Sequence, residues 1–331
     1  MLAALVLSGP SLVRAKSLLA IFPLENTRIT SDYDWFGSYV EGYLRANLTR
    51  MGQVDLISFE VLRTAPEKGP LVWGGYRLGG TYQKVGRLVQ IKLALSEKGE
   101  EVQSWERTFK PQEMADQLQA LGKAVLERVA PGAQWPANEF YLDPSEETAS
   151  FFKARHKRFT QAEGPSLQEA YRLFTRFGEY EEPLIIAEVA TQLYLASINE
   201  PKEMVELLKK GERLLRRGLV AHPDSAELLA ALALGYYLTR SYPSFIEKTA
   251  EQALRRDSRQ DLALWMKILS VGMQSGQGHE LLLQFRGLNP YGFGSKARLP
   301  YLHGIFKTEM ARAETIIQQV ENPDPMNLQS R

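Results

Sequence analysis

The 331-residue sequence contains no cysteine, and this absence removes several classes of chemistry at once. Disulfides, thiolate catalysis, iron–sulfur clusters and cysteine–zinc sites are all excluded. Histidine is scarce as well: His156, His222, His279 and His303 show no i, i+4 pairing and no HExxH motif. We therefore predict a protein that holds no metal and no other cofactor.

The sequence also lacks an excess of charge of either sign, because 40 Lys and Arg residues balance 39 Asp and Glu residues. A net charge of +1 does not favour nucleic acid or an anionic membrane as the main partner. Basic runs occur at 153–158 ("KARHKR") and 216–218 ("RRG"), and we interpret both as solvated helix faces. We expect other proteins as partners, no nucleic acid, and at most a peripheral association with a membrane.

Long hydrophobic runs are missing too, since no stretch approaches the roughly 18 apolar residues of a transmembrane helix. The apolar start "MLAALVLSGPSLVRA" (1–15) is too short to span a bilayer. Its apolar core and the Val13-x-Ala15 ending are typical of a cleaved export signal, so we expect a periplasmic or otherwise extracytoplasmic protein. The alternative is a plain N-terminal extension on a cytoplasmic protein.

The first part of the chain, residues 17–130, has the pattern of an α+β domain. A continuous apolar run at 18–24 predicts a buried strand, and apolar residues three and four apart at 34–51 predict a helix with Asp34 as its N-cap. A second apolar strand follows at 54–62. This strand–helix–strand order predicts an α/β unit.

Antiparallel strands then follow the α/β unit. Strict alternation of apolar residues and two short glycine-containing turns predict three antiparallel strands over 76–109. Residues 111–129 have the spacing of an amphipathic helix. We therefore expect a mixed sheet with two or three helices, followed by a proline-rich linker at 131–144.

Three stretches of this domain resemble a known bacterial module. They are "AIFPLEN" (20–26), "DWFGSYVEGYLRANLTRMGQVDLIS" (34–58) and "GGTYQKVGRLVQIKLAL…GEEVQSWERTF" (79–109). Their order is similar to that of the TolB-like amino-terminal domain, which is related to FlgO-type and CsgG-type domains. Leu24 stands where Phe is usual, and Thr81 replaces Ser. The resemblance implies a bacterial, envelope-linked module that binds proteins and has no catalytic residues.

Helical periodicity dominates residues 145–325, with proline or glycine breaks every 12 to 20 residues or so. This spacing predicts about seven to nine helices in antiparallel pairs. The stretches 209–227 and 246–264 superpose at a period of roughly 35 residues. Between them, Leu234 and Gly235 match the Leu-Gly signature of a tetratricopeptide repeat first helix, here expected at 228–242. We expect an all-α solenoid of tetratricopeptide type; an irregular helical bundle is the alternative.

Two groups of residues are candidates for binding. In a tetratricopeptide-like pair, Tyr236, Thr239 and Arg240 would point into the concave face, and Tyr and Arg are frequent interface anchors. The loop "NPYGFGSKARLPY" (289–301) mixes aromatic and basic side chains that could stack on a ligand. The four loop candidates are Tyr291, Phe293, Lys296 and Arg298. Packing on neighbouring helices is the alternative for both groups.

We find no motif that predicts catalysis. The stretch "SFFK" (150–153) fits SxxK formally, but its companion motifs are missing, and we interpret Phe151 and Phe152 as core residues. The sequence thus predicts a non-catalytic adaptor or scaffold of the bacterial cell envelope that binds proteins through its solenoid. The alternative function is a ligand-sensing module that relays occupancy to a signalling partner.

Overall fold

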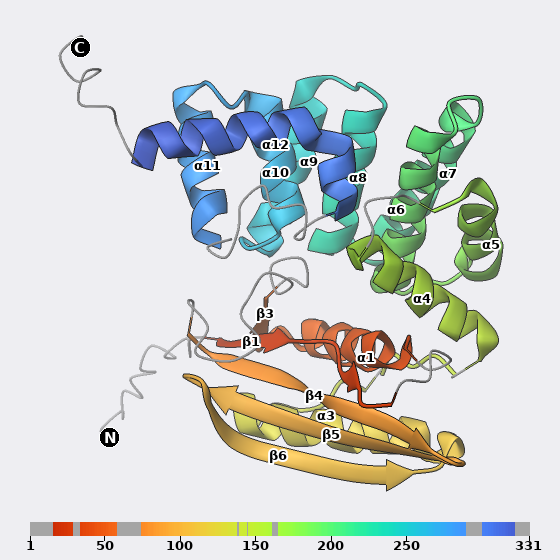
Figure 1. The fold of residues 1–331 in the computed structure, drawn as a ribbon. Coiled ribbons are helices and arrows are strands. Elements are labelled where there is room, and N and C mark those ends of the chain that lie inside the picture. Colours follow the sequence, from red (N-terminus) through yellow and green to blue (C-terminus); the bar gives the residue numbers. More distant parts are fainter. Residues whose placement is uncertain are drawn as a thin grey trace, which may run out of the picture.

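The computed structural model describes residues 16–28, 34–57, 74–137, 139–143, 145–160, 165–288 and 300–321. A mixed β-sheet formed by the first part of the chain lies beneath an array of helices formed by the rest (Figure 1). The expected order, an α+β region followed by helices, is therefore confirmed. None of the helices in these residues is long and apolar enough to cross a membrane.

The sheet contains six strands, with parallel pairing at one end and antiparallel pairing at the other. The strands are β1 (Ser17–Ile21), β2 (Glu25–Asn26), β3 (Val54–Leu56), β4 (Tyr76–Val85), β5 (Leu88–Glu97) and β6 (Glu100–Phe109). Their order is β3-β1-β4-β5-β6, and β2 pairs with β4 beyond the end of β1. β1 is parallel to β3 and β4, whereas β4, β5 and β6 form an antiparallel meander. The predicted α/β unit and the predicted meander are both present.

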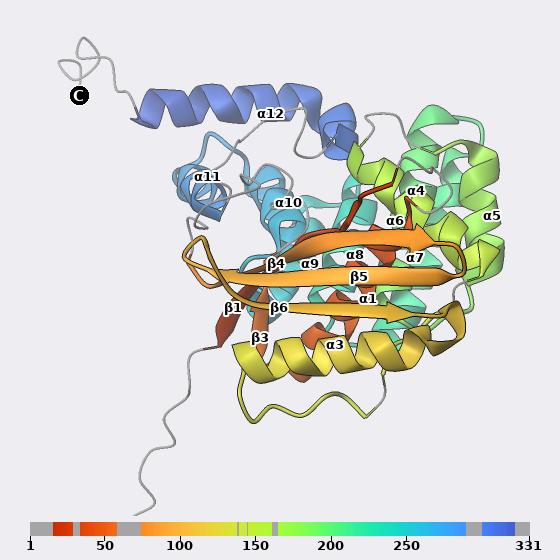
Figure 2. The ribbon, with the colours of Figure 1, turned by 60° about the horizontal axis from the view of Figure 1, so that its bottom comes forward.

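One face of the sheet is buried and the other is polar. In β5, Val89, Ile91, Leu93 and Leu95 are fully buried, as their strict alternation predicts. This face lies against two helices, α1 (Phe36–Met51) and α3 (Met114–Val129), which also contact each other. Figure 2 shows α3 lying along the sheet beside β6. The open face is consistent with an antiparallel sheet, which needs only one covered side.

The sequence predicts the C-terminal end of α1 correctly and its N-cap wrongly. Gly52 ends the helix in the left-handed conformation (φ 62°), as its position predicts. The N-cap is Trp35 without a side-chain hydrogen bond, and not Asp34. Asp34 instead accepts a hydrogen bond from the Asn26 side chain at 3.0 Å, so it ties the start of the helix to β2.

Nine helices follow the segment 131–144 in the described part of the chain, at the upper end of the predicted number. They are α4 (Glu146–Thr160), α5 (Leu167–Phe177), α6 (Pro183–Asn199), α7 (Met204–Ala221), α8 (Ala226–Leu238), α9 (Pro243–Arg256), α10 (Asp261–Val271), α11 (Gly276–Leu288) and α12 (Pro300–Glu321). Each helix from α5 to α11 packs on the next, and α8 also contacts α6 and α10. The helices from α6 to α11 therefore form stacked pairs.

Glycine allows the closest approaches in this stack. A Cβ atom on Gly235 of α8 would lie 2.4 Å from the hydroxyl of Tyr194 in α6, and one on Gly211 of α7 would lie 2.4 Å from the same ring. Tyr194 is fully buried between these three helices. The Leu234-Gly235 pair, singled out in the sequence, thus marks a tight helix contact.

The segment expected to be a linker is packed along α1. Its residues Phe140 and Leu142 are buried. The Asn47 side chain bonds both the N–H and the C=O of Phe140, and the Tyr39 hydroxyl donates to the Leu142 carbonyl at 2.8 Å. One continuous cluster of buried apolar side chains accordingly extends from β1 to α12.

Candidate functional site

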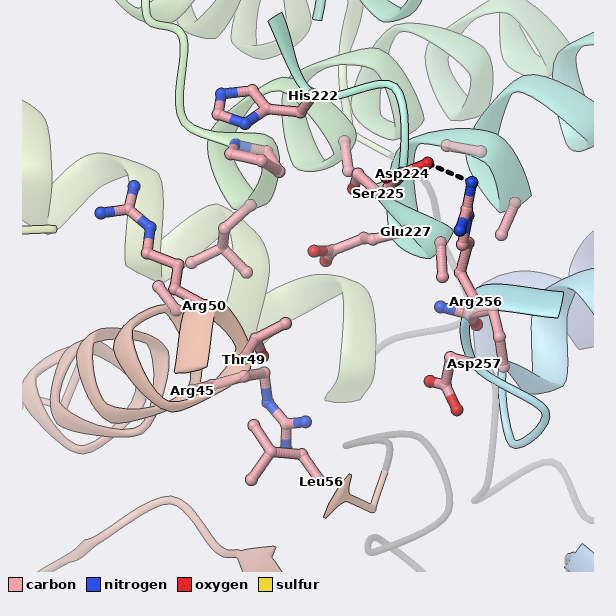
Figure 3. A pocket seen from close by; sticks show the side chains of 18 of the residues that line it. Arg45, Thr49, Arg50, Leu56, His222, Asp224, Ser225, Glu227, Arg256 and Asp257 are labelled. Atoms are coloured by element: carbon pink, nitrogen blue, oxygen red, sulfur yellow. Dashed lines mark ion pairs between the residues drawn. The ribbon is translucent and has the colours of Figure 1, made fainter. Parts of the chain in front are cut away.

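A cleft of about 510 Å³ lies between the sheet region and the helical array. One wall is the C-terminal half of α1 with β3, and the other is formed by the N-terminal ends of α6 and α8 and by the turn before α10. Small apolar residues line part of it, among them Ala187, Ala230 and Ala231. Charged side chains of both signs surround this apolar part (Figure 3).

A buried ion network joins the two walls at the base of the cleft. Glu41 of α1 is 1% exposed and accepts hydrogen bonds from Arg45, one turn later, and from Arg155 of α4 at 2.6 Å. Arg155 also lies 3.9 Å from Glu188 of α6, and Glu188 accepts a hydrogen bond from Gln192 at 2.7 Å. The network therefore connects α1, α4 and α6.

The charges in this network stabilise one another. Burial alone would raise the pKa of Glu41, but attraction to Arg155 and Arg45 lowers it below its ordinary value. Glu41 is therefore ionised at neutral pH although its side chain is inaccessible to solvent. Buried charges of this kind fix geometry, because any rearrangement would leave one of them without a counter-ion.

Further ion pairs cross the cleft nearer its rim. Arg50 of α1 pairs with Glu182, which precedes α6. Asp55 of β3 pairs with Arg259, in the turn between α9 and α10, at 3.1 Å. Both pairs connect the sheet region to the helical array. Burial raises the pKa of Glu182 despite the attraction of Arg50, so this carboxyl is partly withdrawn from water.

Two carboxylates project into the cleft itself. Figure 3 shows Glu227 reaching inward from the start of α8 and Asp257 lying on the same wall, at the end of α9, below the Arg256–Asp224 pair. Burial raises the pKa of Asp257, although the backbone N–H of Arg259 donates to it at 2.9 Å. The charges of Arg259 and Arg45 act against the effect of burial on Asp257, and a further cationic group beside it would also favour its ionised form.

Arg45 supplies a hydrogen-bond donor on the α1 side. Its Nε is bonded to Glu41 and its Nη1 donates to the Ile57 carbonyl at 3.0 Å. Its Nη2 is buried and has no hydrogen-bond partner among the described residues. A carbonyl or carboxylate oxygen of a bound molecule could accept from this donor only after the Arg45 side chain turns toward the cleft.

The structure places the first group of predicted binding residues at the end of α8. The helix expected over 228–242 ends at Leu238, because the chain leaves helical geometry at Arg240, and Pro243 then starts the next helix. Thr239 is the C-cap, and its hydroxyl donates a hydrogen bond to the Gly235 carbonyl. Arg240 lies in the following turn and has a left-handed backbone conformation (φ 53°). These two residues are therefore not on the helical face where the repeat pattern put them.

Tyr236, the third residue of that group, belongs to an aromatic surface cluster. Its hydroxyl accepts a hydrogen bond from Arg216 of α7 at 2.8 Å, and its ring lies 6.3 Å from that of Phe245. Tyr242, 76% exposed, stands 6.3 Å from the same Phe245 ring. The sequence analysis missed Tyr242 and Phe245, although aromatic residues flanking a turn proline are a usable signal.

The remaining candidates have mixed outcomes. The loop residues Tyr291, Phe293, Lys296 and Arg298 lie outside the described residues. Phe151 and Phe152 are fully buried, which confirms them as core residues. No group of three or more His, Asp or Glu side chains in the described ranges could hold a metal ion.

The interpretation of the basic run 153–158 as a solvated helix face is wrong for one residue. Lys153 and Lys157 are exposed, as expected, but Arg155 is 4% exposed and belongs to the buried ion network. Arg155 lies one turn after Phe151, on the apolar face of α4. This spacing could have indicated that Arg155 is buried. Glu188 gave a similar signal, since it is the one charged residue within the apolar helix α6.

No protein-family model matches the chain, and no curated protein matches it.

Proposed function

We propose that the protein is a non-catalytic binding protein and that its cleft takes an extended, basic segment of another protein. The observation that supports this most is the pair of acids that face the cleft, Glu227 and Asp257, between two walls that ion pairs join at the rim. Basic side chains of the segment would face these acids. Once its side chain turns toward the cleft, Arg45 Nη2 would donate to one of its backbone carbonyls.

The wider setting of this proposal is an envelope scaffold. The stacked pairs of α6 to α11 are compatible with tetratricopeptide-like repeats, in which α6, α8 and α10 would be the first helices. The sheet region, with its parallel β1–α1–β3 unit and its meander, is compatible with a TolB-like domain. We propose that the protein works outside the cytoplasm and that its partners are envelope proteins.

A second candidate function is the sensing of a small molecule in the same cleft. A volume of about 510 Å³ falls in the range typical of small-molecule sites. A ligand bridging the two walls would stabilise the folded chain by mass action. Thermal unfolding in the presence of a metabolite panel tests this candidate, because a reproducible rise in Tm with one compound favours sensing over peptide binding.

Binding of blocked peptides tests the first candidate. We would measure fluorescence anisotropy with labelled six-residue peptides, acetylated and amidated, that carry Lys at alternate positions, and with matched peptides that carry Glu there. Lys peptides should bind and Glu peptides should not. Glu227→Gln and Asp257→Asn should each weaken binding about tenfold, the cost of roughly 1.4 kcal/mol for a lost charge-assisted contact.

Glu127→Gln is the matched control, since Glu127 is an exposed acid on α3, away from the cleft. It should leave the affinity unchanged. Equal binding of Lys and Glu peptides, or binding that survives both cleft substitutions, would contradict the proposal.

A further inference from the structure

The turn between β4 and β5 exposes two apolar side chains at the end of the sheet. The strands pair up to Val85 opposite Leu88, so the turn itself consists only of Gly86 and Arg87. Gly86 has φ 62°, which a two-residue hairpin turn favours in glycine. Val85 is 42% exposed and Leu88 is 37% exposed. Both side chains lie on the open face of the sheet, because cross-strand partners share a face and the next residue, Val89, is buried.

Four cationic side chains surround this apolar pair. Lys84 and Arg87 belong to the hairpin, and both are exposed. Arg28, which follows β2, is exposed as well, and its guanidinium donates to the Lys84 carbonyl at 3.2 Å. Lys110 is exposed and comes directly after β6, the strand beside β5. We call this surface the cationic tip; its members are Arg28, Lys84, Val85, Arg87, Leu88 and Lys110.

Acidic side chains are missing from the hairpin that carries the cationic tip. From residue 76 to residue 96, β4 and β5 contain four Lys and Arg residues and no Asp or Glu. Acids on neighbouring segments already accept hydrogen bonds: Asp34 from Asn26, Glu106 from Gln90 and Glu113 from the N–H of Lys110. The net charge of the whole chain is only +1, so the positive charge of the tip is a local feature.

The position of the cationic tip favours a partner without a fixed shape. Figure 1 shows the β4–β5 turn at the lower right, whereas α7 to α12 lie above the sheet. No residue of the tip lines the cleft, and none lines the smaller pocket between α4 and α5. A layer of lipid headgroups needs no matching hollow, because it accepts cations at any spacing and lets apolar side chains enter between them.

We propose that the cationic tip docks the protein on an anionic membrane surface. The four cations hold acidic headgroups, and Val85 and Leu88 enter the headgroup layer. Each Lys or Arg near such a surface strengthens binding roughly fivefold, whereas two half-exposed apolar side chains bury too little area to hold the protein on a neutral bilayer. The cleft stays accessible in this arrangement, since the tip contributes nothing to its lining. The proposal therefore does not depend on the function of the cleft.

Co-sedimentation of the full-length protein with vesicles tests the proposal. We would compare vesicles of phosphatidylcholine with vesicles of equal parts phosphatidylcholine and phosphatidylglycerol, at low and at physiological salt. The protein should bind only the mixed vesicles, and more weakly at higher salt, because salt screens the cations. Arg87→Gln and Lys110→Gln should each lower the partition coefficient roughly fivefold, and the double variant about twenty-fivefold. Arg213→Gln, at an exposed position of α7, is the matched control and should leave binding unchanged.

A second measurement follows the apolar pair. Because the chain has no cysteine, Val85→Cys can carry a single environment-sensitive dye such as nitrobenzoxadiazole. Its fluorescence should rise and shift to the blue on mixed vesicles and stay unchanged on neutral ones. Val220→Cys, at an apolar position of α7 that is 85% exposed, is the matched control and should show no change on either. Leu88→Ser should weaken binding to mixed vesicles roughly fivefold, whereas Val220→Ser should not weaken it.

Several results would overturn the proposal. One is equal binding to neutral and mixed vesicles, or binding to neither. Another is wild-type affinity in the Arg87→Gln, Lys110→Gln double variant while circular dichroism shows it to be folded. A third is sedimentation with mixed vesicles while the dye on Val85→Cys reports no change, since another surface would then make the contact. Binding of soluble polyglutamate as tightly as mixed vesicles, unaffected by Leu88→Ser, would assign the tip to an acidic protein segment instead.

Discussion

The helical array contacts the rest of the chain on two sides, and the chemistry of the two sides is opposite. Toward the sheet, the contact includes the buried charges Glu41, Arg155 and Glu188 and encloses a cleft. Toward the C-terminus, the contact is an apolar stripe on one face of α12, made of Phe306, Met310, Ala313 and Ile317. Removing one member of a buried ion network leaves an uncompensated charge, whereas loosening one apolar stripe exposes only the area that the stripe covers. We infer that the first side is the more firmly held and that the second is the more easily released.

The largest expected effect concerns the more firmly held side. Glu41→Gln removes the counter-ion shared by Arg45 and Arg155, and we expect a loss of about 3–5 kcal/mol of unfolding free energy, because half-buried Arg45 loses its carboxylate and buried Arg155 keeps only the more distant Glu188, at 3.9 Å. Urea denaturation of full-length protein measures this loss. Glu127→Gln, an exposed acid on α3, should change stability by less than about 0.5 kcal/mol. A similar small effect of both substitutions would show that the network does not hold the two regions together.

The same substitution should change the pH dependence of stability. The pKa of Glu41 is lower in the folded protein than in the unfolded chain, so its contribution is complete above the unfolded pKa, near 4.3, and is lost as the pH falls through the folded pKa. The wild-type protein should therefore lose stability on acidification below about pH 5 more steeply than the Gln variant. Parallel curves of unfolding free energy against pH would contradict this assignment.

The second effect concerns the side that α12 covers. Phe306→Ala should cost about 3 kcal/mol, the lower end for a buried aromatic residue, and the loss should be local to α12. Hydrogen exchange should accelerate in residues 307–319 while α6 and α7 keep their wild-type protection. Accelerated exchange throughout the array would mean that α12 is an integral part of the stack.

A third effect tests the stack that lies between the two sides. Gly235→Ala places a methyl group 2.4 Å from the Tyr194 hydroxyl, and we expect a loss of about 1–3 kcal/mol from overpacking. Gly276→Ala is the control, because a Cβ atom there meets no neighbour within 4 Å. Thermal unfolding compares the two variants. An unchanged Tm for Gly235→Ala would mean that α6 and α8 approach less closely than described.

The smallest effect concerns the rim of the cleft. The Asp55–Arg259 pair has both side chains more than a third exposed, so a double-mutant cycle with Ala should give about 0.2–1 kcal/mol, reduced by salt. This pair is the partly exposed counterpart of the buried network. A coupling above about 2 kcal/mol would remove the distinction between a fixed base and an adjustable rim.

The sequence predicted the elements of this molecule better than their contacts. The alternation in β5, the apolar spacing of α1 and the Gly52 stop are local patterns, and the structure confirms each of them. The ion network was missed because Glu41, Arg155 and Glu188 are more than 30 residues apart in sequence, and their pairing depends on how α1, α4 and α6 meet. Arg155 was misread because its neighbours Lys153 and Lys157 are exposed.

Even less of the candidate site than of the fold could be predicted from the sequence. The cleft is lined by ends of helices that no local pattern brings together, and its inward-facing acids, Glu227 and Asp257, resemble ordinary helix-end residues in the sequence. The proposed role of Tyr236, Thr239 and Arg240 relied on a repeat register that ran four residues past the real end of α8. The aromatic cluster around Phe245 becomes visible only once that end is known.

Hydrogen–deuterium exchange of the full-length wild-type protein tests the difference between the two sides most directly. We predict that residues 307–319 of α12 exchange at least about a hundredfold faster than the buried parts of α4 and α6, which the ion network holds against α1. Equal protection of α12 and α6 would contradict the account, because α12 would then be as firmly fixed as the sheet side.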